Sequence, residues 1–117
     1  TRTVPVELIV NGKPIARDVI EADGKLRKVT FDCPIEYSSW VALRVLPSSH
    51  TNPIFVTVNA KPIRSSKKSA EWCRAAVDRC WQMKMPQIRE SERPAAKAAY
   101  DLARAYYNKA IAEAAAE

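Results

Sequence analysis

The sequence is poor in the residues that most often build catalytic and metal sites. Its 117 residues include one His, three Cys and two Gly. One imidazole and three thiols leave little material for a metal centre or a histidine-based catalyst, and two glycines cannot form a glycine-rich phosphate-binding loop. No apolar run approaches the roughly 20 residues that a membrane span requires. The sequence therefore predicts no transmembrane segment and offers no ready-made catalytic motif.

The cysteines do not form a disulfide framework. Cys33, Cys73 and Cys80 are odd in number and show no close spacing such as C-x-x-C. If Cys73 and Cys80 share a helix they lie two turns apart, about 10 Å, which is farther than a disulfide tolerates. We therefore expect three reduced and buried thiols.

What the chain does have is the composition of an ordinary globular protein, with 47% hydrophobic and 27% charged residues. Its length predicts a single domain over residues 1–117. The net charge is +6, but residues 1–64 carry nine basic and six acidic side chains and residues 65–117 carry ten and seven. Because the signs are interleaved, a solvated mixed surface is favoured, and neither nucleic acid nor a membrane is an expected partner.

The first half of the chain has the period-two alternation of strands with one buried face. Asn11 and Gly12 supply the two positive-φ residues of a type I′ hairpin turn between strands at residues 4–10 and 14–20. Gly24 suits a second turn. Further strands are expected at residues 29–33, where Val29, Phe31 and Cys33 face one side, and at residues 41–45 and 54–58. On the second face, Trp40 and Phe55 indicate that both sides are partly covered.

After Arg64 the apolar period changes to that of helices. Ser65 or Ser66 is the expected N-cap of a first helix, which ends at Pro86. Ser91 is the expected N-cap of a second helix, which has Pro94 in its first turn. Apolar positions span about half of each helix's circumference. Trp72 and Trp81 fall at opposite edges of the first arc, which favours two separate packing contacts over a stacking platform for sugars or bases.

These patterns together predict an α+β chain: a β-rich part at residues 1–64 followed by two packed helices at residues 65–117. The β-rich part is an antiparallel β-sheet or a partial Ig-like β-sandwich, and the helices form a C-terminal hairpin.

The best candidate for a site is the polar loop between two strong strands. It consists of Ser48, Ser49, His50, Thr51 and Asn52. It would serve as an interdomain or ligand-binding loop. The competing interpretation is a proline-bounded turn whose side chains satisfy their own backbone. A Ser–His nucleophile is disfavoured because adjacent strand residues point to opposite faces, and a zinc site lacks ligand pairs at the usual spacing. No catalytic and no metal-binding residue is assigned.

Several strings resemble one known family. They are V-E-L-I-V-N-G-K-P at 6–14, A-D-G-K at 22–25, S-S-W-V-A-L-R at 38–44, S-S-H-T-N-P at 48–53, S-A-E-W-C at 69–73 and A-A-Y-D-L-A-R-A at 98–105. Together they resemble the C-terminal region of CehA/McbA-type metallohydrolases, which are related to the PHP phosphoesterases. The resemblance covers nearly the whole chain, and the strings at 38–44 and 48–53 are its most specific parts.

The resemblance implies a parent enzyme that binds a divalent metal in a catalytic domain preceding Thr1 and that is exported, periplasmic or extracellular, in a bacterium. This sequence has no His-x-His and no His/Asp/Glu cluster, so no catalytic or metal residue carries over and no cofactor is expected in this chain. A start at Thr1 without Met agrees with an excised fragment. The expected role is a non-catalytic accessory domain packed on the catalytic domain.

Two alternatives stay open at this point. The chain could be an autonomous β-sandwich-type binding module for carbohydrate, protein or nucleic acid. A third, weaker hypothesis is a small hydrolase that uses His50.

Overall fold

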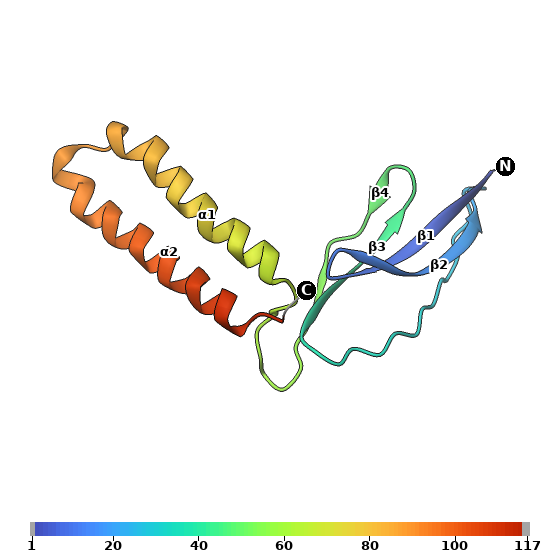
Figure 1. Ribbon diagram of the computed structural model, residues 1–117. Coiled ribbons are helices and arrows are strands. Elements are labelled where there is room, and N and C mark those ends of the chain that lie inside the picture. Colours follow the sequence, from blue (N-terminus) through green and yellow to red (C-terminus); the bar gives the residue numbers. More distant parts are fainter. Residues whose placement is uncertain (1, 116–117) are drawn as a thin grey trace. The chain divides into compact units, whose positions relative to one another are not determined.

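The computed structural model describes residues 2–115 and confirms the α+β fold class (Figure 1). A five-stranded antiparallel sheet precedes two helices. The strands are β1 (Thr3–Val10), β2 (Lys13–Glu21), β3 (Ser39–Val45), β4 (Ser49–His50) and β5 (Ile54–Val56). The helices are α1 (Lys67–Lys84) and α2 (Arg93–Glu113), with short 3₁₀ turns η1 (Met85–Gln87) and η2 (Glu90–Glu92) between them.

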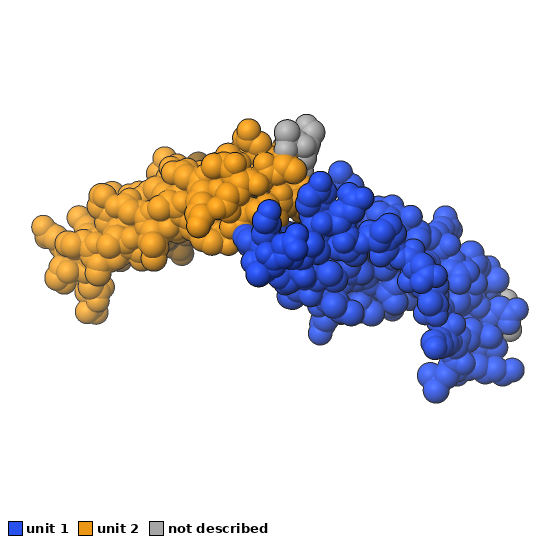
Figure 2. Space-filling view, turned by 90° about the horizontal axis from the view of Figure 1, so that it is seen from below, with its two compact units in different colours: residues 1–63 blue, residues 64–117 orange. Residues whose placement is uncertain are grey.

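The chain divides into two compact units, residues 1–63 and 64–117 (Figure 2). The division lies within one residue of the expected change from strands to helices after Arg64. The first is called the sheet unit and the second the helical unit, and each is described by itself.

In the sheet unit, β1 is the central strand, with β2 on one side and β3 on the other, and β4 and β5 both pair with β3. The predicted hairpin turn is confirmed, because Asn11 and Gly12 have φ values of 51° and 85°. Val4, Val6 and Leu8 alternate along β1 and are buried, as is Ile9 after a register shift. The hydrophobic core of this unit is therefore centred on β1.

The prediction of a strand at residues 29–33 is wrong. No strand is assigned there, although Val29, Phe31 and Cys33 are half-buried and Thr30 and Asp32 are exposed. The alternation correctly predicted which side chains point inward, but burial alone does not require a hydrogen-bonded neighbour strand. The later strands were predicted more closely, since β3 covers residues 41–45 and β5 is a shortened form of 54–58. Strand β4 was not predicted.

In the helical unit, α1 and α2 run side by side in opposite directions (Figure 1). The Ser66 cap is confirmed, since its Oγ accepts a hydrogen bond from the Ser69 amide at 3.1 Å. Pro86 lies in η1 directly after α1, as expected. The Ser91 cap is wrong, because Ser91 lies within η2 and no side chain caps α2; Pro94 does occupy the first turn of α2.

Among residues 2–115, neither helix combines the length and the apolar character that crossing a membrane would demand.

Candidate functional site

The polar loop expected as a site forms the tight connection between β3 and β4 and the segment after it. Thr51 fastens its end, since the Thr51 amide donates to the Leu43 carbonyl at 2.9 Å and the Leu43 amide donates to Thr51 Oγ1 at 3.0 Å. Each of its five residues, Ser48, Ser49, His50, Thr51 and Asn52, is exposed. The loop is thus fastened to β3 through the backbone and the hydroxyl of Thr51, and its residues are exposed to solvent.

His50 belongs to a row of ionisable residues across one sheet face. In the strand register His50 lies opposite Arg44, Arg44 opposite Glu7, and Glu7 opposite Arg17. Arg44 binds Glu7 through Nε at 2.9 Å and Nη2 at 2.5 Å, and the Glu7 side chain is only 12% exposed. The row therefore places one paired carboxylate among two guanidinium groups and an imidazole.

The serines of the S-S-W string are structural anchors that sequence reasoning did not single out. Both are buried. Ser38 Oγ donates to the Lys61 carbonyl at 2.6 Å and accepts from the Val58 amide at 2.8 Å. Ser39 Oγ donates to the Tyr37 carbonyl at 2.7 Å. Two adjacent serines at the start of a strand were the available signal, because a hydroxyl that becomes buried there must find a hydrogen-bond partner.

No cluster of three or more His, Cys, Asp or Glu side chains that could hold a metal ion is found within residues 2–115. The three cysteines are free, as expected. The expected burial is wrong, because Cys80 is exposed and Cys33 and Cys73 are only half-buried. Cys80 Sγ lies 3.1 Å from the Tyr100 hydroxyl, and this hydrogen bond, followed by desolvation, raises the pKa of Tyr100 above its ordinary 10.0.

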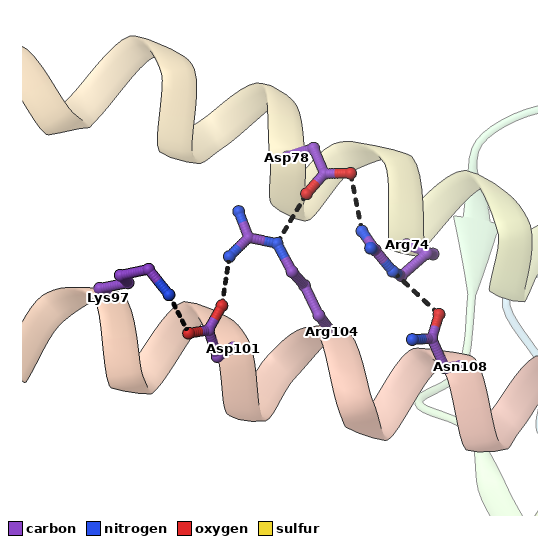
Figure 3. A network of polar contacts seen from close by, with 6 residues as sticks. All are labelled: Arg74, Asp78, Lys97, Asp101, Arg104 and Asn108. Atoms are coloured by element: carbon purple, nitrogen blue, oxygen red, sulfur yellow. Dashed lines mark hydrogen bonds and ion pairs between the residues drawn. The ribbon is translucent and has the colours of Figure 1, made fainter.

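One side of the helical unit carries an ion-pair network that joins the two helices (Figure 3). Asp78 of α1 accepts from Arg74 Nη1 at 2.8 Å and from Arg104 Nε of α2 at 2.7 Å. Arg104 also binds Asp101 at 2.8 Å, and Lys97 binds the other Asp101 oxygen at 2.6 Å. Five charged side chains, Arg74, Asp78, Arg104, Asp101 and Lys97, thus form a continuous chain across the helix pair.

The network shifts the titration of its members. Hydrogen bonds from Arg104 and then Arg74 hold the pKa of Asp78 below its usual range. Lys97 and then Arg104 lower the pKa of Asp101. Asp78 in turn raises the pKa of Arg104. Each carboxylate is therefore stabilised in its charged form, which suits a structural ion pair better than a general acid.

Between the same helices lies an apolar groove of about 460 Å³, called the hairpin groove. Its lining residues are Trp72, Cys73, Ala76, Val77 and Cys80 of α1 and Ala99, Tyr100, Ala103 and Tyr107 of α2. Trp81 packs on Tyr100 with ring centroids 5.0 Å apart, whereas Trp72 is 73% exposed. The two tryptophans therefore do not form one platform: Trp81 makes an expected packing contact, whereas Trp72 stays mostly exposed.

The sheet unit also exposes large apolar side chains. Ile54 and Phe55 of β5 are each 69% exposed, while Trp40, the cross-strand neighbour of Phe55, is half-buried. The expectation that the second face is partly covered is wrong at Phe55.

Comparisons with protein-family models, with curated proteins and with solved structures gave no match for this chain.

Proposed function

We propose that this chain is a non-catalytic C-terminal accessory domain of a PHP-like metal-dependent hydrolase, and that it packs on the catalytic domain preceding it in the same polypeptide. The observation that carries the proposal is the exposure of β5. Ile54 and Phe55 follow one another in this strand and are each 69% exposed. Successive strand residues point to opposite faces, so β5 presents a large apolar side chain on both.

An edge strand of this kind needs cover. Exposed edges with apolar side chains invite pairing with other chains, and folded proteins normally blunt them with charge or cover them with another element. Strand β5 consists of Ile54, Phe55 and Val56 and carries no charge. A neighbouring domain that covers both of its faces would remove this liability, and this supports packing against another domain.

The hydrolase part of the proposal rests on the family resemblance of the strings at 38–44 and 48–53. The resemblance implies that the divalent metal and its ligands belong to the preceding domain, which borders the packed chain, and that the parent enzyme is exported from a bacterial cell. The 48–52 loop follows β3 and leads to β5. If the catalytic domain packs on β5, the adjoining 48–52 loop lies close to the boundary between the two domains. Its polar side chains would then be available for contacts at that boundary.

The test is to express the polypeptide encoded before Thr1 separately and to titrate it with this chain in a calorimeter. We expect micromolar binding or tighter, and we expect Phe55→Asp to weaken it about 10- to 100-fold, because covering one large apolar side chain contributes about 1.5–3 kcal/mol. Thr57→Asp, at an exposed position beyond the strand, is the matched control and should bind like the parent chain.

Two results would overturn the proposal. One is the absence of binding by the unaltered chain. The other is an upstream reading frame that encodes no metal-ligand cluster such as His-x-His.

A further inference from the structure

Strand β2 forms a free edge of the sheet. Its nine residues pair with β1 on one side, and no described strand pairs with them on the other. A strand in this position presents a row of unpaired N–H and C=O groups, which is a template for adding a strand of another chain. The backbone groups along this edge therefore need protection if the sheet is not to be extended there.

The hydrogen bonds next to β1 show which residues of β2 direct their backbone outward. The Ala22 amide donates to the Arg2 carbonyl at 2.8 Å, so this pair bonds across the two chain segments. Bonded and non-bonded pairs alternate in an antiparallel ladder. Glu21, Val19 and Arg17 belong to the non-bonded pairs, and their N–H and C=O groups point away from β1.

A proline and a bulge blunt the beginning of this edge. Ile15 is the extra residue of a β-bulge, because the register with β1 passes from Ala16 directly to Pro14. Proline has no N–H to offer to an added strand. Prolines and bulges are two of the devices with which natural proteins protect edge strands.

An inward-pointing carboxylate occupies the middle of the edge. Asp18 lies opposite Val6 in the register, and Val6 is buried, so Asp18 stands on the core face of the sheet. Asp18 is nevertheless exposed, and its Oδ1 accepts a hydrogen bond from the Val19 amide at 2.7 Å. The outward donor of Val19 is therefore taken by the side chain that precedes it.

An arginine from the following segment occupies the end of the edge. Arg27 Nε donates to the Glu21 carbonyl at 3.3 Å, and Arg27 Nη2 binds Asp23 Oδ2 at 2.5 Å. The other Asp23 oxygen accepts from the Lys25 amide at 3.1 Å, so the carboxylate that holds Arg27 is itself held in place. The outward acceptor of Glu21 is therefore taken as well.

Two copies of β2 are complementary to each other in one antiparallel register. When Val19 lies opposite Val19 of the second copy, each Arg17 lies opposite a Glu21, and opposite charges face one another across the strands. The central pair in this register bonds through the Val19 amides, and the Arg17 amides need the Glu21 carbonyls. These are the two groups that Asp18 and Arg27 occupy.

We infer that Asp18 and Arg27 guard the edge of β2 and keep two copies of this chain from joining their sheets. They form an autoinhibitory contact, because each holds a backbone group that strand pairing would use. Without both side chains, the Val19 donor and the Glu21 acceptor are free, and two copies pair through β2 about a two-fold axis.

The experiment compares the unaltered chain with the double variant Asp18→Ala/Arg27→Ala by sedimentation equilibrium over a range of concentrations. We expect the double variant to self-associate at a concentration at least about 10-fold lower, because the freed groups form hydrogen bonds across the two copies. Lys28→Ala/Asp32→Ala removes one charge of each sign from exposed positions outside the strands. This matched control should behave like the unaltered chain.

A third substitution shows whether association proceeds through β2. The Val19 amide points away from β1, so Val19→Pro removes no hydrogen bond of the β1–β2 ladder. Added to the double variant, Val19→Pro should return self-association to the level of the unaltered chain. Asp18 and Arg27 are both exposed, so circular dichroism should show the same folded content in every variant. Asp18→Ala alone should shift the association in the same direction by a smaller amount.

Three results would overturn the inference: a double variant that associates no more readily than the unaltered chain, a control that associates as readily as the double variant, or association that survives Val19→Pro. The test uses this chain alone and does not rest on the proposed function, which concerns β5.

Discussion

Asn11 and Trp40 are joined by two hydrogen bonds across 29 positions of sequence. The backbone amide of Asn11 donates to the Trp40 carbonyl at 3.0 Å, and the backbone amide of Trp40 donates to the side-chain Oδ1 of Asn11 at 3.1 Å. The Asn11 side chain also donates through Nδ2 to Ser39 Oγ at 3.1 Å. One turn residue thus supplies the positive φ of the β1–β2 hairpin and fastens that hairpin to the beginning of β3.

Replacing Asn11 with Ala should destabilise the sheet unit by about 1–3 kcal/mol, because the part-buried Trp40 amide and Ser39 hydroxyl lose their partner. Alanine is also disfavoured at the φ of 51° that Asn11 adopts. Urea unfolding followed by tryptophan fluorescence measures the change. Asn52→Ala, in the exposed loop, is the control and should stay within about 0.5 kcal/mol of the parent chain. Equal effects of the two substitutions would contradict the role of Asn11.

Ser38→Ala should also cost about 1–3 kcal/mol, since it leaves the Val58 amide and the Lys61 carbonyl without the Ser38 hydroxyl. The same substitution at exposed Ser48 is the comparison and should be nearly neutral. Both variants are read by the urea midpoint. A neutral Ser38→Ala would mean that the S-S-W string is not retained for its hydrogen bonds.

Local chemistry made much of the fold predictable from sequence. Asn11 and Gly12 specify a turn that few other residue pairs allow, and Ser66 precedes an apolar helical period by the spacing of a cap. The segment at residues 29–33 shows where this reasoning ends. Alternation reports which side chains are buried, whereas strand pairing depends on a neighbour that the segment itself does not encode.

The candidate site was harder to predict because its contacts join distant segments. The sequence singled out the 48–52 loop for its polarity, and only the register of three strands places His50 opposite Arg44 and Arg44 opposite Glu7. The pair of Asp78 and Arg104 is separated by 26 positions and depends on how α1 faces α2. The exposure of Phe55 and Trp72 could not be predicted either, because a sequence does not show whether an apolar side chain is covered by its own chain or left exposed.

Ser66→Ala should destabilise the helical unit by about 1 kcal/mol, the usual cost of losing an N-cap. The Ser66 hydroxyl satisfies the Ser69 amide, one of the four amides that lack partners in the first turn of α1. Thermal unfolding followed by helical circular dichroism measures this loss. Ser65→Ala removes the neighbouring hydroxyl, which is exposed, and should be silent. If Ser65→Ala were the more costly variant, the helix would begin one residue earlier than the structure shows.

The ion-pair network predicts a loss of helical-unit stability in acid. The pKa values of Asp78 and Asp101 are lowered from their ordinary 3.8 in the folded chain. The unfolded chain therefore takes up protons first as the pH falls, and the stability that these carboxylates contribute is present above 3.8 and is lost as the pH falls from there through the lowered values. Arg104, with its pKa raised, stays charged throughout this range and adds no slope.

Urea unfolding followed by helical circular dichroism, repeated from neutral pH downward, measures this slope. Asp78→Asn should be less stable than the parent chain at neutral pH and should lose less on acidification, because it removes one of the two carboxylates that titrate. Both aspartate side chains are nearly half exposed, so added salt should flatten the parent profile by screening the pairs. An equally steep profile in Asp78→Asn would assign the acid sensitivity to carboxylates outside the network. Asp23 of the sheet unit, whose pKa is also lowered, would then be the next residue to replace.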